Sequence, residues 1–265
     1  MRRGVLLGGS LLSLVLLAWG VSLLVSYDVV SDVDISRASE LPSIGHLLGT
    51  DHLGRDIGWR LITATLSFVG PGLIACLLAG CLSIIAGALA GWYGGWIGES
   101  FRYLFTVISA IPRFVLVLLV CSIYGSTVWN IALASAIAYS PKMVESIYNR
   151  IAYFRVAEFV LAAEAHGVHP RRILSYHLVW VNCRHLIFRH MLTLFSYFLL
   201  VETTLSFIGG FGVVEPQPSW GNMIAFEWGV RDGNPWATFA PAIAIWAVIL
   251  GCALLVEGIR EDEHA

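Results

Sequence analysis

The side chains that could do chemistry gather in two short stretches, and the first lies near residue 50. Gly49-Thr50-Asp51 is followed closely by Gly54-Arg55-Asp56. Thr50 and Asp51 can accept hydrogen bonds from nearby backbone N–H groups, as such side chains do in turns. Arg55 can hold a carboxylate through two parallel hydrogen bonds. This pattern predicts a compact turn that serves either as a rigid platform or as a contact surface for another protein.

The second stretch is the polar segment between residues 145 and 184. Glu158 begins a run of helix formers that ends at Gly167, a residue suited to a left-handed C-terminal cap. Pro170 can then open a second helix. A two-helix excursion with exposed apolar side chains can lie in a groove on a partner protein or rest on a membrane surface.

Catalytic and cofactor chemistry has little support in the remaining residues. The five cysteines form no Cys-x-x-Cys pair, and the histidines at 166, 169, 177, 185 and 190 lack the spacing of metal ligands. The single lysine, Lys142, is not in a glycine-rich loop, so a phosphate-binding P-loop is excluded. A net charge of -2 argues against nucleic acid as a partner. We expect no catalytic residue, no metal site and no cofactor in this chain.

The elements that must position these stretches are membrane helices. Hydrophobic residues make up 57% of the 265 residues and charged residues only 13%, far from the roughly 25% charged residues of soluble domains. Charge-free runs of about 20 residues predict an all-α integral membrane protein with one domain over residues 1–265. Six spans are expected, at about 5–26, 61–92, 102–123, 128–143, 185–208 and 236–256, with a cytoplasmic loop at 145–184.

The distribution of basic residues predicts the orientation. Nine Lys and Arg residues lie in the terminal segments and in 142–184, against four in 28–60 and 209–235. The positive-inside rule therefore places both termini and the loop at 145–184 in the cytoplasm.

Three features stand out inside the predicted spans. Arg113 follows Pro112 in the third span, and Glu202 lies near the outer end of the fifth. Intramembrane charges often mark a transport path, but Arg113 could also pair with an acid of a partner subunit or snorkel, and Glu202 could stabilise the bundle. In the second span small residues recur every fourth position, which predicts close packing against another helix of this chain or of a second subunit: Ala75, Ala79, Ser83, Gly87, Gly91 and Gly95.

Four motifs resemble the permeases of ABC importers of the dipeptide, oligopeptide and nickel type, and specifically their C-type membrane subunit. Residues 46–56 are similar to H-x-L-G-T-D-x-x-G-R-D, residues 202–221 to E-x-x-L-S-F-L-G followed by P-x-P-S-W-G, and residues 257–262 to a D-x-L-R-D tail. The fourth is the EAA loop, E-Y-V-x-A-A-R-A-x-G, matched by residues 158–167 and including Glu158, Phe159, Ala162, Ala163 and Gly167. Glu164 departs from this pattern, because Arg is usual there.

The resemblance implies a transport subunit of a bacterial inner membrane, not an enzyme. It implies a second homologous permease, two cytoplasmic ABC ATPase subunits that bind the ATP, and an extracytoplasmic solute-binding protein. The loop at 158–167 would couple the ATPase to the spans, and Arg113 and Glu202 could line half of a translocation path for peptides or related small solutes. A self-sufficient secondary transporter or channel is the alternative, although the expected internal repeat of broken helices is not evident.

Overall fold

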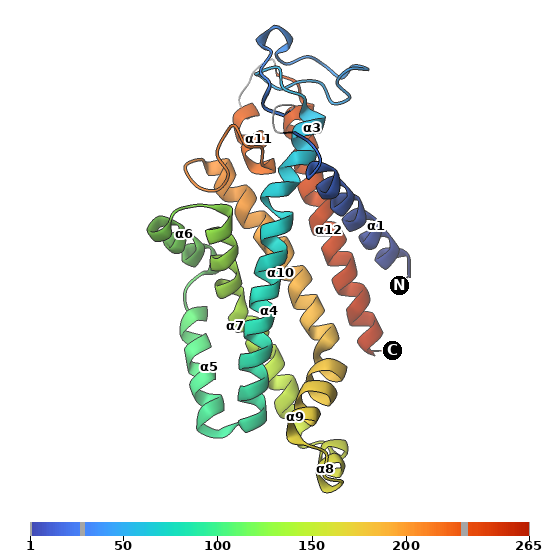
Figure 1. Cartoon of the computed structure of the whole chain (residues 1–265), viewed down its shortest axis with the longest axis vertical. Helices are drawn as coiled ribbons and strands as arrows, with labels where there is room; N and C mark the ends of the chain where they lie inside the picture. The colour runs from blue at the N-terminus through green and yellow to red at the C-terminus, as the bar shows by residue number, and fades with distance from the viewer. Residues whose placement is uncertain (1, 27–29, 229–232, 265) are drawn as a thin grey trace.

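The computed structural model describes residues 2–26, 30–228 and 233–264, so Arg231, one of the four basic residues counted on the outer side, lies outside the described parts. Within them the chain is helical, with a single isolated bridge between Thr50 and Asp56 as its only strand-like pairing. Most long helices run along the long axis of the molecule (Figure 1). The loops before α3 gather at one end with α11, and α8 lies at the other end.

The helices have the following bounds: α1 Arg2–Ser22, η1 Ile35–Arg37, α3 Ile57–Thr63, η2 Ala64–Ser67, α4 Val69–Tyr93, α5 Gly95–Ser109, α6 Arg113–Tyr124, α7 Val128–Arg155, α8 Glu158–Ala165, α9 Pro170–Arg172, η3 Ile173–Cys183, α10 Arg184–Ile208, α11 Trp220–Glu227 and α12 Trp236–His264.

Four helical stretches of the described chain are long and apolar enough to cross a membrane: Arg3–Ser22, Ile57–Tyr93, Pro170–Ile208 and Trp236–Glu261. They correspond to the first, second, fifth and sixth predicted spans, and the second, fifth and sixth are longer than predicted. The expectation of an all-α membrane protein is therefore confirmed, while the count of six continuous spans is not.

The third predicted span, 102–123, is wrong as one straight helix. The chain forms two helices there, Gly95–Ser109 and Arg113–Tyr124, bent by 80° at the break between them. Pro112 explains the break, because proline has no N–H to donate and disfavours helical geometry at the residue before it. Counting the bent pair as one span gives up to five.

The helix that contains the fourth predicted span extends well past the predicted end of that span. Residues 128–143 form only the first part of α7, which continues as one helix through Arg155. After the short helix α8, the next long helical stretch begins at Pro170, confirming the predicted helix start. Helix therefore covers much of 145–184, and the connection between the two long helices is confined to residues 156–169, which include α8. Sequence composition missed this because polar residues do not by themselves end a helix.

The stripe of small residues on α4 packs within the chain, against α7. A Cβ atom added at Gly87 would lie 2.9 Å from the carbonyl oxygen of Val144 and from Cβ of Ile147. At Gly91 it would lie 2.9 Å from the carbonyl oxygen of Tyr148. Gly95 belongs to α5 and has no such neighbour. The α4 backbone approaches α7 closely only because these positions lack side chains.

Candidate functional site

The predicted turn near residue 50 is built around the carboxylate of Asp51. Its Oδ1 accepts hydrogen bonds from the backbone N–H groups of Leu53 and Arg55, each over 2.9 Å. Gly54 completes the turn with a φ of 77°, a left-handed conformation that suits glycine. The compact turn that the sequence predicts is present, and the structure shows that Asp51 lies at its centre.

Thr50 and Gly49 join this turn to the segment before it. Oγ1 of Thr50 accepts a hydrogen bond from the Glu40 N–H over 2.9 Å and donates one to the Arg37 carbonyl. Gly49 has a φ of 77°, and a side chain there would overlap the Glu40 carbonyl and the amide of Asn234. In the same segment the hydroxyl of Ser36 donates to Asp34 and lowers the pKa of that exposed carboxyl.

Asp56 starts helix α3. Its Oδ1 accepts the N–H of Trp59 over 2.8 Å, the arrangement of a helix N-cap. Its Oδ2 lies 2.6 Å from Nδ1 of His46. Asp56 therefore orients the helix that carries Arg60, and the predicted motif serves as the base on which the membrane helix begins.

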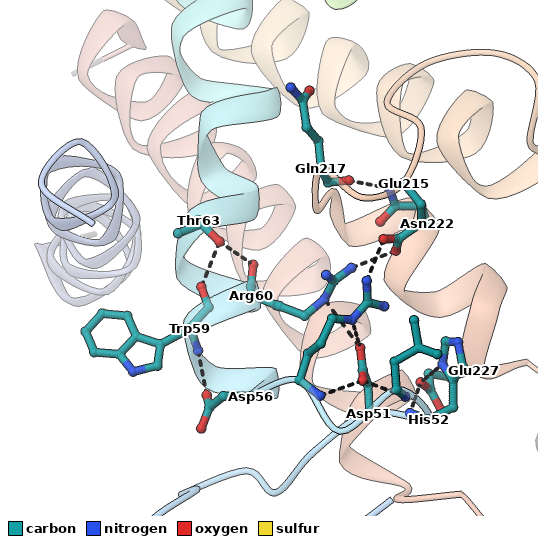
Figure 2. Close-up of polar contacts among 12 residues, drawn as sticks. Asp51, His52, Asp56, Trp59, Arg60, Thr63, Glu215, Gln217, Asn222 and Glu227 are labelled. Carbon is teal, nitrogen blue, oxygen red and sulfur yellow. Dashed lines mark hydrogen bonds and ion pairs between the residues drawn. The ribbon is translucent and has the colours of Figure 1, made fainter. Parts of the chain in front are cut away.

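Two arginines and two acids form a mostly buried network behind this turn (Figure 2). Nε of Arg55 donates to Oδ2 of Asp51 over 2.7 Å, and its Nη1 donates to Oε2 of Glu215 over 2.8 Å. Nη2 of Arg60 donates to Oε1 of Glu215 over 2.7 Å. Arg55 thus bridges two different carboxylates, whereas the sequence suggested that one carboxylate takes both bonds.

The sequence interpretation missed Arg60 and Glu215. Glu215 directly precedes the Pro216-Gln-Pro-Ser-Trp-Gly221 motif, and Arg60 follows the first motif by one helical turn. Each lies beside a motif that had been singled out, and charged residues are rare in this chain. A rare charged residue next to a recognised motif could have pointed to both positions, but only the fold shows that the two residues meet.

The Pro-rich motif, residues 216–221, is held against the start of the helical stretch Ile57–Tyr93. Ser219 caps α11 in a reciprocal capping box with Asn222. Nε1 of the buried Trp220 donates to the Leu61 carbonyl over 3.0 Å, and its ring lies 4.6 Å from that of Phe68. The two sequence motifs therefore form one unit, which we call the outer platform, after the side of the membrane that the sequence predicts for it, and define as residues 34–61 together with 213–227.

Asp51, His52 and Glu227 bring three potential metal-ligand atoms within 4.8 Å of one another. However, Asp51 already accepts three hydrogen bonds, one of them from the Arg55 guanidinium. His52 points its Nδ1 at Oε1 of Glu227, 2.7 Å away, and Glu227 also accepts the His52 N–H. The cationic neighbour and the occupied oxygens favour a structural role for this group over a metal site.

Glu202 lies fully buried in α10. Its Oε1 accepts the Ser206 hydroxyl over 2.9 Å, and Oγ of Ser206 in turn accepts the Val213 N–H over 2.9 Å. This chain of hydrogen bonds links the end of α10 to the loop that follows. Glu202 contacts the interior of the bundle in this structure.

Arg113 is the first residue of α6, immediately after the 80° break. Its side chain is exposed, and its guanidinium carbon lies 5.1 Å from the centroid of the Tyr139 ring in α7. Arg113 and Glu202 therefore occupy different environments, although the sequence placed both as charges within spans.

The loop predicted to couple to a partner forms helix α8, at the opposite end of the molecule from the outer platform (Figure 1). Val160 is buried, and Ala163 packs against the same cluster. The other predicted residues are exposed: Glu158, Phe159, Ala162, Glu164 and Gly167. Gly167 has a φ of 73°, confirming the predicted left-handed cap, and the Val168 N–H closes the turn onto the Ala163 carbonyl over 3.0 Å.

Comparison with known proteins identifies the family of this chain. The family described as "binding-protein-dependent transport system inner membrane component" matches residues 83–260. The chain is 28% identical to a dipeptide transport system permease of Alkalihalophilus pseudofirmus over 87% of this chain and 75% of that protein. It is 27% identical to a glutathione transport system permease of Pectobacterium atrosepticum over 94% and 82% of the two chains. The same identity links it to a nickel transport system permease of Escherichia coli over 88% and 84%. The chain therefore belongs to the family of inner-membrane permease components of binding-protein-dependent transport systems.

Proposed function

We propose that this chain is one of two related permease subunits of an ATP-driven importer for peptides or similar small solutes. The complex would add two cytoplasmic ATPase subunits and a solute-binding protein on the outer side. The observation that carries the proposal is the pairing of the family match with an exposed short helix, α8, at one end of the bundle and a rigid platform at the other. ATP would be bound by the partner chains, since this chain has no P-loop.

Six membrane crossings fit this assignment. Helices α5 and α6 together would make one broken crossing, and α7 would make another. Helix α7 has 28 residues and packs along α4 and α10, so its interior position explains why it is less apolar than a lipid-facing helix. An even number of crossings puts both termini on one side, and the distribution of basic residues favours the cytoplasm as that side.

Helix α8 would transmit the movement of the ATPase to the spans. Its buried Val160 packs with Ile151 of α7 and Ile173 of the helical stretch that continues into α10. Phe159 and Leu161 remain 44% and 54% exposed, which leaves an apolar surface for a groove on the ATPase. A shift of α8 would therefore act directly on two long helices. Glu164 adds an acidic group to this surface, so we expect a basic residue opposite it.

The outer platform would receive the binding protein. Its buried ion pairs hold two distant chain segments in one shape, and a preformed surface binds a partner with less loss of conformational entropy. The relatives are named for dipeptides, glutathione and nickel, so peptides or small solutes are the proposed cargo. A secondary transporter or channel is not favoured, because the family depends on a binding protein.

Co-purification tests the proposal. Tagged wild-type chain, extracted from its native membrane in mild detergent, should bring down an ABC ATPase and a second permease, identified by mass spectrometry. Changing Phe159 and Leu161 together to aspartate should remove the ATPase while the second permease stays bound. Ile44→Asp, at a fully exposed site in the platform loops, is the matched control and should retain both. Failure to recover any ATPase with the wild type would refute the assignment.

A further inference from the structure

Arg113 is a basic residue on a part of the bundle surface that is otherwise uncharged and largely apolar. It lies beside Tyr139, the twelfth of the 28 residues of α7, and thus near the middle of that helix. The exposed residues near Arg113 on α5 and α6 carry no charge: Val107, Val115 and Leu119 are hydrophobic, and Thr106 and Ser109 are small and polar. A charged side chain at this depth does not face hydrocarbon, so it faces either water or a polar group.

The described part of the chain provides no acid for Arg113. Its guanidinium contacts the face of the Tyr139 ring, a cation–π interaction that leaves the N–H groups able to donate elsewhere. A guanidinium presents several N–H donors in a plane that matches a carboxylate. Among the described residues Arg113 therefore has no anionic partner, and the planar arrangement of its N–H donors suits a carboxylate.

Polar side chains continue from Arg113 along the contact between α7 and α10. The Tyr139 hydroxyl lies 3.3 Å from Nδ1 of His190, and Nε2 of that ring lies 3.0 Å from Oγ of Ser146. The Tyr197 ring lies 6.4 Å from that of Tyr139, and its buried hydroxyl has no hydrogen-bond partner among the described residues. Ser146 is seven residues beyond Tyr139, so this polar seam extends about 10 Å along α7.

We propose that Arg113 and this seam form a site about halfway across the membrane that binds a negatively charged group of the cargo, such as a carboxylate. Arg113 makes the direct contact, and Tyr139 positions it. The seam then offers hydroxyl and imidazole groups in sequence toward the end of the bundle that carries α8. This inference rests on the proposed transport function, because it takes the exposed side of Arg113 as part of the translocation path.

The alternative partner for Arg113 is an acidic side chain of the second permease. In that case the guanidinium would be neutralised and its surroundings closed to solvent. The two situations differ in two measurable properties, namely access of water-soluble reagents and the local electrostatic potential. Both can be read without knowing the cargo.

The experiment uses the assembled complex in membranes with Cys81→Ser, which removes the exposed cysteine. Ser109→Cys then places a thiol four residues before Arg113, at the end of α5. Modification rates are measured with a sulfonate-bearing and a trimethylammonium-bearing methanethiosulfonate reagent, without nucleotide and with ADP and vanadate. We expect modification in at least one state, with an anion-to-cation rate ratio roughly fivefold higher with Arg113 than with Arg113→Gln, as a nearby unit charge in a watery site produces.

Two controls make the result specific. Arg113→Lys should keep most of the ratio, because the positive charge stays. Ser122→Cys, at the far end of α6, should show a ratio that changes little when Arg113 becomes Gln. No modification of the thiol introduced by Ser109→Cys in either state, or a ratio independent of Arg113, would overturn the inference. Neither result would affect the importer assignment, which is tested separately by recovery of the ATPase.

Discussion

Arg60 and Glu215 lie 155 residues apart in the chain, and Nη2 of Arg60 donates to Oε1 of Glu215 over 2.7 Å. Arg60 is almost fully buried, and Glu215 also accepts a hydrogen bond from Nη1 of Arg55. This ion pair joins the start of the second long helix to the loop after α10. The shape of the outer platform therefore depends on a contact that neither segment can make alone.

Replacement of Glu215 by Gln should destabilise the platform. Two buried guanidinium groups would lose their shared carboxylate; removing one partner of a buried pair costs about 3–5 kcal/mol. Since the Glu215 side chain keeps 20% exposure, we expect about 2 kcal/mol, seen as a lower Tm of the purified complex. Glu99→Gln, which breaks an exposed pair with Arg102, is the control and should leave the Tm unchanged. Equal Tm values for both variants would contradict the role given to Glu215.

Gly87→Ala should weaken the contact between α4 and α7. The added methyl group would lie 2.9 Å from the Val144 carbonyl oxygen, and overpacking of this kind costs about 1–3 kcal/mol. Gly9→Ala is the matched control, since nothing lies within 4 Å of its added Cβ, and it should be neutral or slightly stabilising. Thermal unfolding of the two variants in the same detergent measures the difference, and a loss shared by both would argue against close packing at Gly87.

Trp220→Phe separates the hydrogen bond of Trp220 from its packing. The substitution removes the Nε1–H that donates to the Leu61 carbonyl but keeps a ring beside Phe68, so it should cost about 1 kcal/mol. Trp220→Ala also loses the packing of a buried ring and should cost about 3–5 kcal/mol. Thermal unfolding of both variants provides the comparison. Similar losses would mean that the hydrogen bond, not the ring, anchors the motif.

Ser206→Ala should disconnect the loop after α10 from Glu202. The Ser206 hydroxyl both donates to Glu202 and accepts from the Val213 N–H, so its loss leaves two buried polar groups without this partner. We expect a cost of about 2 kcal/mol. Hydrogen exchange at the Val213 amide should rise in the variant, and an unchanged exchange rate would show that the bond does not protect that amide.

Glu202→Gln tests whether Glu202 takes part in transport. Gln keeps the shape and can still accept the Ser206 hydroxyl, so a structural role predicts that uptake by the reconstituted complex is retained within about twofold, a difference of about 0.4 kcal/mol in activation energy. Ser206→Ala, measured in the same assay, reports the effect of loosening the same contact. Loss of uptake in Glu202→Gln at unchanged Tm would instead place Glu202 in the path.

Much of the fold could be predicted from the sequence, because membrane helices leave a strong local signal. Runs without charge identified four of the helices that the structure shows as long enough to cross, and Gly167 and Pro170 correctly indicated a helix end and a helix start. The third predicted span failed at Pro112, because residue types alone do not measure how far the chain bends there. The predicted end of the fourth span at residue 143 did not mark the end of α7, because a polar stretch can remain helical when it packs against neighbours.

The candidate site was predicted one motif at a time. Asp51 and Gly54 suffice for a turn, since a side chain that accepts hydrogen bonds from backbone N–H groups two and four residues later and a left-handed glycine act over a few residues. The sequence could not show that Arg55 and Arg60 share Glu215, because that contact depends on how α10 packs against the helical stretch Ile57–Tyr93. It also could not separate Glu202, which the fold buries, from Arg113, which the fold leaves exposed.

The sequence by itself determined that this is an all-α membrane protein, which family it resembles, and where its short turns lie. All of these follow from composition or from residues close in the chain. Only the tertiary structure decided which charges meet, which small residues allow helices to touch, and that, within the described chain, the arginine at the break between α5 and α6 is left without an acid. The physical reason is that burial and ion pairing are properties of surfaces brought together from distant segments. The residue types show which surface each helix carries, and the packing of the helices shows which other surface it contacts.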